Sequence, residues 1–131
     1  MNLFATTALL VTVGVSSLTA AQAPSLVVAK FHADWCGACR AMGDVATDLA
    51  NKHDGQPILF VTMDLTNATT KRQSEMRAAA LGLGDLFDAN HDKTGFLVVV
   101  DAKTRVEVAR LTREQSLKDM SGALAKALPK P

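Results

Sequence analysis

The sequence predicts a single α/β domain in the order β-α-β-α-β-β-α, with a mixed four-stranded sheet flanked by three helices. Short apolar runs of strand length alternate along the chain with stretches that repeat apolar residues at the helical period. The composition, 48% hydrophobic and 21% charged over 131 residues, is that of one globular domain. An early β-α-β unit implies a parallel strand pair and a late hairpin implies an antiparallel one, so we expect a mixed sheet.

The first half of the domain contains two strands and one helix. Residues 25–33 form a short apolar run typical of a strand buried on both faces. The period then becomes helical, and we expect Gly55 to end this helix. Its apolar face comprises Met42, Val45, Ala46 and Leu49. The next apolar run, residues 58–63, predicts a second strand in the centre of the sheet.

The middle of the chain predicts a helix followed by a long loop. Residues 70–81 have helical periodicity, with Met76, Ala79 and Ala80 on the side expected to face the core. Residues 84–95 are rich in turn-forming side chains and are expected to form a loop. Loops of this length in compact domains are more often functional than neutral.

The last part of the chain predicts a hairpin and a final helix. Residues 96–100 and 105–111 read as two strands joined by a short connection. Thr112 and Gln115 have the spacing of a capping box, and Pro129 is expected to end the helix. The predicted buried stripe of this helix comprises Leu117, Met120, Leu124 and Leu128.

The N-terminal segment differs from the rest of the chain in charge. All 14 Lys and Arg residues and all 13 Asp and Glu residues lie at or after Lys30. We predict residues 1–23 to be a secretory signal peptide, with residues 24–131 as the mature domain in the periplasm or outside the cell. Two alternatives remain open: residues 3–21 are an uncleaved membrane anchor, or they form a buried element of the domain.

Charge and cysteine content exclude two classes of function. The net charge is +1 with no basic run, so the chain lacks the clustered Lys and Arg with which proteins bind phosphates, and we expect no nucleic-acid partner. The chain has only two cysteines, which excludes a small secreted scaffold held together by several disulfides.

The two cysteines stand where the first predicted strand ends and the first helix begins, in the segment Trp35-Cys36-Gly37-Ala38-Cys39. A helix N-terminus presents unpaired N–H groups and a partial positive charge, and both lower the pKa of a thiol. Cys36 is therefore the candidate nucleophile. Cys39 lies one helical turn further on and is the candidate resolving thiol.

The pair has three other interpretations: a stabilising disulfide, a zinc site and two inert thiols. A disulfide across four residues removes only about 2 kcal/mol of unfolded-state entropy, so it would stabilise the fold little. A zinc site would need two further ligands. A metal-binding or metal-delivery module using the same cysteines with His32 or His91 remains the alternative function. Two inert buried thiols would not explain the placement at a helix start.

Residues 31–40, which read FHADWCGACR, resemble the active-site segment of the thioredoxin superfamily. With the element order, the resemblance covers residues 25–128. The segment is most similar to extracytoplasmic thioredoxin-like thiol:disulfide reductases, including the C-terminal domain of the membrane thiol:disulfide interchange protein. The resemblance implies a thioredoxin-like fold and a protein-disulfide reductase in which Cys36 attacks a partner disulfide and Cys39 releases the product.

The resemblance also implies partners and an active-site rim. The partners are protein disulfide substrates and a thiol electron donor such as a membrane reductase, and no cofactor is expected. The absence of histidine between the cysteines favours a reductant. The rim comprises Trp35, Gly37, Ala38, Thr94 and Gly95, the last two standing where the family carries a cis-proline. Lys30 stands where many members carry a buried Asp.

Overall fold

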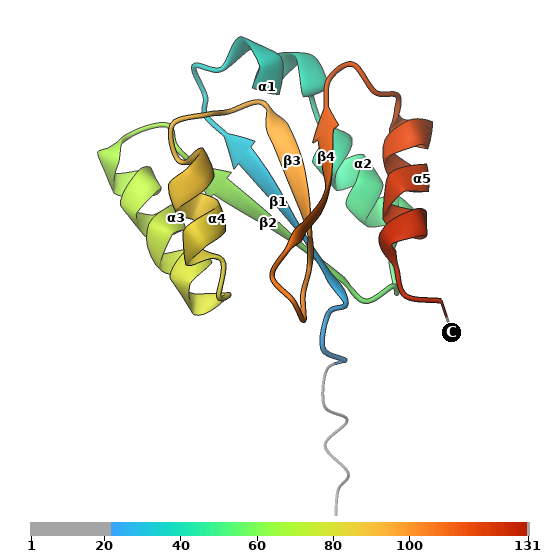
Figure 1. Cartoon of the computed structure of the whole chain (residues 1–131). Coiled ribbons are helices and arrows are strands. Elements are labelled where there is room, and N and C mark those ends of the chain that lie inside the picture. Colours follow the sequence, from blue (N-terminus) through green and yellow to red (C-terminus); the bar gives the residue numbers. More distant parts are fainter. Residues whose placement is uncertain (1–21, 131) are drawn as a thin grey trace, which may run out of the picture.

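The computed structural model describes residues 22–130, which fold around a four-stranded sheet of strand order β2-β1-β3-β4 (Figure 1). β1 (Leu26–His32) pairs in parallel with β2 (Ile58–Asp64) and antiparallel with β3 (Phe96–Asp101). β3 also pairs antiparallel with β4 (Glu107–Thr112). The predicted mixed four-stranded sheet is thereby confirmed.

The predicted signal peptide, residues 1–23, lies outside the described part of the chain except for its last two residues, and the alternative anchor, residues 3–21, lies wholly outside it. The signal peptide stays a prediction. Across residues 22–130 the longest apolar helices are all too short or too polar to cross a lipid bilayer.

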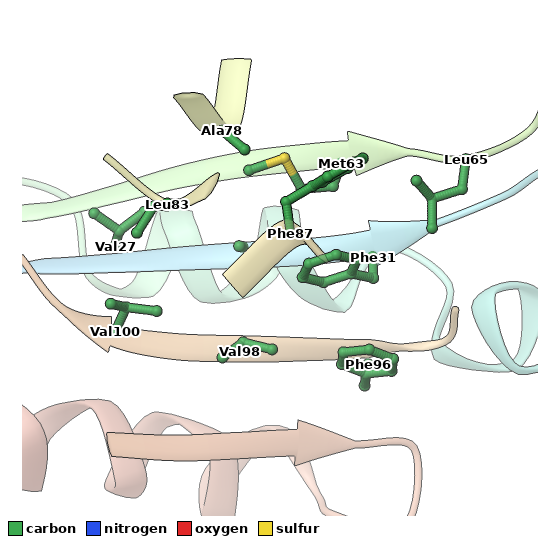
Figure 2. Packing of buried hydrophobic residues seen from close by; sticks show 11 residues of the cluster. Val27, Phe31, Met63, Leu65, Ala78, Leu83, Phe87, Phe96, Val98 and Val100 are labelled. Atoms are coloured by element: carbon green, nitrogen blue, oxygen red, sulfur yellow. The ribbon is translucent and has the colours of Figure 1, made fainter. Parts of the chain in front are cut away.

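Helices cover both faces of the sheet (Figure 1). α1 (Gly37–Met42), α2 (Val45–Lys52) and α5 (Leu117–Ala127) belong to one side, here called the α2/α5 face. α3 (Ala68–Ala80) and α4 (Gly84–Asn90) cover the other side, the α3/α4 face. Figure 2 shows the core of the α3/α4 face, where Phe31 of β1 stacks at 5.2 Å between ring centroids on Phe96 and at 6.5 Å on Phe87 of α4.

The first predicted helix is divided in two. Gly43 follows α1 with φ +52°, a left-handed conformation that favours glycine, and α2 begins two residues later. α2 ends at Lys52 with His53 as its C-cap, so Gly55 lies beyond the helix end. The break places α1 over the end of β1, where the two cysteines lie, and leaves α2 to pack on the sheet.

β2 lies at an edge of the sheet, so the prediction of a central position is wrong. Only Met63 of this strand is fully buried. α3 packs on it, and the Arg77 guanidinium donates a hydrogen bond to the carbonyl oxygen of Thr62. A continuous apolar run therefore does not separate a central strand from an edge strand that helices cover.

The predicted inward face of α3 is also wrong. Met76 is 65% exposed, and Ala79 and Ala80 are exposed as well. The residues that face the sheet are Ser74 and Ala78, whose small side chains allow close approach of the helix. Because alanines occupy three consecutive positions, the apolar pattern alone could not fix which side of the helix faces inward.

The predicted loop over residues 84–95 contains the helix α4, so that expectation is wrong for its first half. Leu83, Phe87 and Asn90 are buried at intervals of four and three residues, which is the helical period. Gly82 has φ +70° and ends the preceding helix, and Gly84 then begins the new one. The sheet therefore carries five helices in residues 22–130 instead of three.

The last helix begins later than its predicted capping box. The box consists of Ser116 and Asp119: the Ser116 hydroxyl accepts the Asp119 N–H at 3.1 Å, and the Asp119 carboxylate accepts the Ser116 N–H. Gln115 still reaches back, because its side-chain oxygen accepts the Thr112 N–H at 2.8 Å. Of the predicted stripe, Met120 and Leu124 are buried, Leu128 is half-buried and Leu117 is exposed.

Candidate active site

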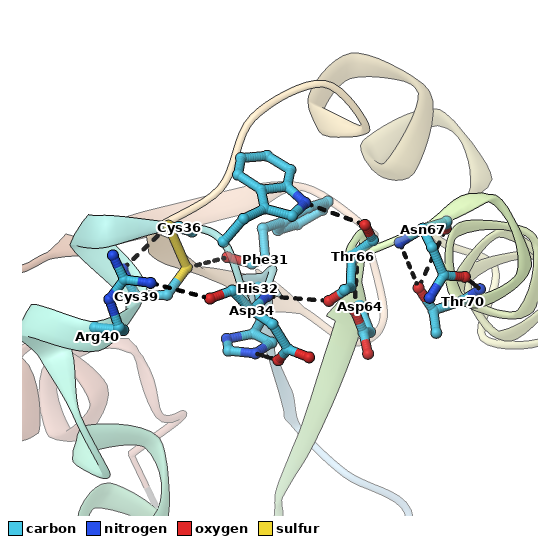
Figure 3. A network of polar contacts seen from close by, with 11 residues as sticks. Phe31, His32, Asp34, Cys36, Cys39, Arg40, Asp64, Thr66, Asn67 and Thr70 are labelled. Atoms are coloured by element: carbon cyan, nitrogen blue, oxygen red, sulfur yellow. Dashed lines mark hydrogen bonds and ion pairs between the residues drawn. A yellow bond between two sulfur atoms is a disulfide. The ribbon is translucent and has the colours of Figure 1, made fainter.

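Cys36 follows β1 closely and is the N-cap residue of α1. Its sulfur accepts a hydrogen bond from the backbone N–H of Cys39 at 3.1 Å (Figure 3). The two sulfur atoms lie at disulfide distance, with Cα atoms 5.2 Å apart. A sulfur in this position receives both a backbone N–H and the positive end of the helix, and both favour a thiolate. The structure places the two cysteines where the sequence predicts them.

Both cysteines are nearly buried, with 6% of Cys36 and 3% of Cys39 exposed. Cys39 Sγ lies 3.8 Å from the carbonyl oxygen of Phe31, so its thiol can donate to that oxygen once the disulfide is reduced. The same carbonyl accepts the N–H of Gly95 at 2.9 Å. Cys36 is thus slightly more exposed than Cys39, and the Cys39 sulfur faces the backbone of β1.

Gly95, the residue before β3, lies against the dithiol. Its φ is +91°, and a Cβ at this position would lie 2.6 Å from the Cβ of Ala38 and 3.4 Å from Cys36 Sγ. Only glycine allows this close approach. Gly95 and Ala38 of the predicted rim therefore meet at the sulfur of Cys36. Gly37 begins α1 beside them, and Thr94, half-exposed, precedes Gly95.

Trp35 stands on the rim and is joined to the loop that follows β2. Its indole N–H donates to the carbonyl oxygen of Thr66 at 3.1 Å, and the backbone N–H of Asp34 donates to the Thr66 hydroxyl at 3.0 Å (Figure 3). Sequence reasoning missed Thr66 as a site residue. The predicted parallel pairing of the first two strands was a signal for it, because the carboxyl ends of parallel strands share one edge of the sheet.

His32 ends β1 between two carboxylates. Its Nε2 lies 3.1 Å from Asp34 Oδ1, and its register partner in β2 is Asp64. Burial raises the pKa of Asp64, but hydrogen bonds from Thr66 and the nearby charge of His32 outweigh it, so this pKa lies below its ordinary value of 3.8. Asp64 is therefore held ionised beside the active-site loop.

The histidines proposed as metal ligands have other neighbours. Nε2 of His32 contacts Asp34, and His91 lies 3.4 Å from the Lys71 amine and packs on the Phe87 ring. Over residues 22–130 the structure brings no three His, Cys, Asp or Glu side chains into a group able to hold a metal ion. The dithiol thus offers two ligands, and further ligands would have to come from elsewhere.

Lys30 takes the place of the buried acid that the resemblance leads one to expect. It is half-buried in β1 and borders a cavity of about 210 Å³ between α2 and the strands β1 and β2. Thr47 and Thr62 line the same cavity. The partial exposure of Lys30 agrees with the free-energy cost of burying an ammonium group that has no opposite charge beside it.

Comparison with known proteins agrees with this geometry. A family model described as Thioredoxin matches residues 16–79. Tryparedoxin from Trypanosoma brucei is 20% identical with a TM-score of 0.53, and the match covers 78% of each chain. A thioredoxin-like protein from Aeropyrum pernix is 16% identical with a TM-score of 0.52, over 80% of this chain and 79% of the other.

No curated protein sequence matches the chain. At these identities the similarity to solved structures shows the fold alone, and that fold is the thioredoxin-like one. The family model spans β1, both cysteines, β2 and most of α3. The family-model match and the solved structures agree on a thioredoxin-like fold for this chain.

Proposed function

We propose that the protein is a thiol-disulfide oxidoreductase that reduces protein disulfides outside the cytoplasm through Cys36 and Cys39. The observation that carries the proposal is the N-cap position of Cys36, whose sulfur accepts the Cys39 N–H, in a thioredoxin-like fold. An N-cap sulfur is more acidic than a free thiol, so more of it is thiolate at neutral pH. The thiolate is the species that attacks disulfides.

The proposed cycle transfers two electrons to the substrate. The Cys36 thiolate attacks one sulfur of the substrate disulfide, which forms a mixed disulfide and releases the other sulfur as a thiolate. Cys39, deprotonated, then attacks Cys36 Sγ, which closes the Cys36–Cys39 disulfide and releases the second substrate thiol. The two protons of the dithiol end on the two substrate thiols, and an external thiol donor must reduce the protein again.

The direction and place of the reaction rest on two sequence features. The residues between the cysteines, Gly37 and Ala38, include no histidine to stabilise the reduced thiolate strongly, which favours a reductant over a strong oxidant. The charge-free N-terminal segment supports export. Outside the reducing cytosol such a pair depends on a dedicated electron source, for which a membrane reductase is the proposed donor.

Turnover of a model protein disulfide by the reduced protein tests this function. We expect the wild type to reduce it, Cys36→Ser to be inactive, and Cys39→Ser to stop at a mixed disulfide on Cys36. Met76→Gln, altered on the exposed side of α3, serves as the control with wild-type turnover. A Cys36→Ser protein as fast as the wild type would remove the proposal.

The proposed location has its own test. Mass spectrometry of the protein isolated from its native host should show a mature chain that begins near the end of the predicted signal peptide, residues 1–23. An intact N-terminus in a protein that fractionates with the cytoplasm would reject the extracytoplasmic role and leave the redox chemistry to be judged separately.

One feature of the site supports the metal-binding alternative. Gly95 lies beside the Cys36 sulfur, and because it has no side chain it does not shield the sulfur from a metal ion. Anaerobic purification followed by elemental analysis separates the two functions. A stoichiometric metal that disappears when both cysteines are replaced by serine would favour the metal module. Metal-free protein with a fully reducible dithiol would favour the oxidoreductase.

A further inference from the structure

Trp35 is the single tryptophan of the chain, and it lies next to Cys36 with 62% of its surface exposed. Because most of the indole faces solvent, packing alone does not fix its orientation. The hydrogen bond from its N–H to the Thr66 carbonyl oxygen, at 3.1 Å, does so instead (Figure 3). The position of this rim side chain is therefore set by the loop after β2.

Thr66 makes a second bond to the same segment. Its hydroxyl accepts the backbone N–H of Asp34 at 3.0 Å. Two oxygen atoms of one residue thus hold the two consecutive residues that lead into Cys36. The Arg40 guanidinium holds the segment from the other side, since it donates to the Asp34 carbonyl oxygen at 3.2 Å.

Thr66 is in turn anchored to α3. Its N–H donates to Asp64 Oδ1 at 2.8 Å, and the Ser74 hydroxyl accepts the Asp64 N–H at 2.7 Å while it donates to the Asp64 carbonyl oxygen at 3.0 Å. Ser74 is one of the two buried residues of α3. A continuous set of hydrogen bonds therefore runs from the buried side of α3 to the exposed indole.

We propose that Thr66 is a positioning residue of the disulfide-exchange site: it holds Asp34 and Trp35 so that the indole forms a fixed wall beside Cys36 against which protein substrates dock. The proposal rests on the proposed function. The bonds from Thr66 to Asp34 and Trp35 lie near the surface, where water replaces a lost partner at small cost in unfolding free energy. What they determine is the orientation of Trp35.

Two substitutions of Thr66 separate the hydroxyl from the shape of the side chain. Thr66→Val removes the hydroxyl that accepts the Asp34 N–H and keeps the branched shape, and Thr66→Ser keeps the hydroxyl. Both leave the Thr66 backbone carbonyl that accepts the Trp35 N–H, so the pair tests whether the hydroxyl bond to Asp34 is needed to hold Trp35 against that carbonyl. Thr69→Val is the matched control, because Thr69 is exposed at the start of α3 and its hydroxyl makes no hydrogen bond within residues 22–130. Each variant is assayed for KM and kcat with a protein disulfide and for the fluorescence anisotropy of Trp35.

We expect Thr66→Val to raise KM about fivefold, the change that corresponds to one hydrogen bond, with a smaller change in kcat. Its Trp35 anisotropy should fall, because the loss of the Asp34 bond releases the backbone next to Trp35 from the loop that carries the Thr66 carbonyl. Thr66→Ser and Thr69→Val should match the wild type in both measurements. Wild-type KM and anisotropy in Thr66→Val would overturn the proposal, and so would an equal loss in Thr66→Ser.

The two proposals fail in different ways. If the wild type reduced no protein disulfide, the proposed function would fall, and the anisotropy of Thr66→Val would still decide whether Thr66 holds Trp35. If the wild type turned over and Thr66→Val lowered kcat and KM together with unchanged anisotropy, the function would stand and the positioning role would be rejected.

Discussion

The two faces of the sheet achieve burial in different ways. On the α2/α5 face the last helix contributes large side chains, Met120 and Leu124, which are fully buried. On the α3/α4 face the long helix α3 buries only Ser74 and Ala78, and the large side chains come from the strands and α4. A helix can therefore pack on small residues when its neighbours supply the apolar volume. The active site lies where loops from the two faces meet.

The largest effect is expected from truncation on the α2/α5 face. Leu124→Ala removes a fully buried side chain and leaves a cavity between α5 and the sheet, which should cost about 2–5 kcal/mol of unfolding free energy. Urea denaturation followed by circular dichroism measures it. A loss below about 1 kcal/mol would mean that α5 does not depend on this contact.

On the α3/α4 face the opposite change should be harmful. Ala78→Leu inserts bulk where α3 approaches the sheet and should destabilise the protein by about 1–3 kcal/mol through overpacking. The same denaturation experiment applies, with Ala79→Leu on the exposed side of α3 as the control. A stabilised Ala78→Leu protein would contradict the close packing of α3 on the sheet at Ala78.

Ser74 makes a buried polar contact between α3 and β2. Ser74→Ala leaves the Asp64 backbone N–H and carbonyl without the partner they have in the structure, and we expect a loss of about 1–2 kcal/mol. Because Asp64 supports Thr66, Trp35 fluorescence should change as well. An unchanged fluorescence would separate the stability of α3 from the geometry of the rim.

Acid should lower the unfolding free energy through one carboxylate on each face of the sheet, Asp64 on the α3/α4 face and Asp119 on the α2/α5 face. Burial raises the pKa of Asp64, but hydrogen bonds from Thr66 and the charge of His32 lower it by more, so the net pKa lies below the ordinary value of 3.8. The Ser116 hydroxyl and N–H lower the pKa of Asp119 at the start of α5. The stabilisation from each group is present above pH 3.8 and is lost as pH falls through the folded-state pKa. Asp64→Asn and Asp119→Asn should each flatten this acid loss in denaturation curves, and a wild type of constant stability below pH 4 would contradict it.

The smallest effect is expected on the outer side of α3. Met76 is 65% exposed, so Met76→Gln should change the unfolding free energy by less than about 0.5 kcal/mol. Thermal denaturation of the two proteins measures it. A loss of several times that size would show that Met76 is covered in solution.

The α2/α5 face could be predicted from the sequence because large apolar residues repeat at the helical period in α5 and at alternate positions in β1. The α3/α4 face could not. Ala78, Ala79 and Ala80 carry no directional signal, and the helical spacing of Leu83, Phe87 and Asn90 is obscured by Gly82 and Gly84 and by a polar residue at a buried position. Local apolar patterns do not predict the order of the strands in the sheet either.

At the candidate site the cysteines could be predicted, because their placement at a helix start follows from the local sequence. Gly95 was predictable in position but not in geometry, since its contact with Ala38 depends on how β3 is aligned with β1. Thr66 depends on the parallel pairing of β1 and β2. Contacts between residues far apart in the chain depend on which strands are neighbours in the sheet, and the pattern within each strand does not give that order.

The N-cap position of Cys36 is what makes it the nucleophile in the proposed reaction. The most direct test is the pH dependence of alkylation in Cys39→Ser, where Cys36 is the only thiol. We expect the Cys36 thiol to titrate clearly below the ordinary thiol pKa of about 8.5. In Cys36→Ser we expect Cys39 to react more slowly and to titrate at a higher pH than Cys36. A Cys36 thiol that titrates at or above about 8.5 would show that the N-cap position does not activate it.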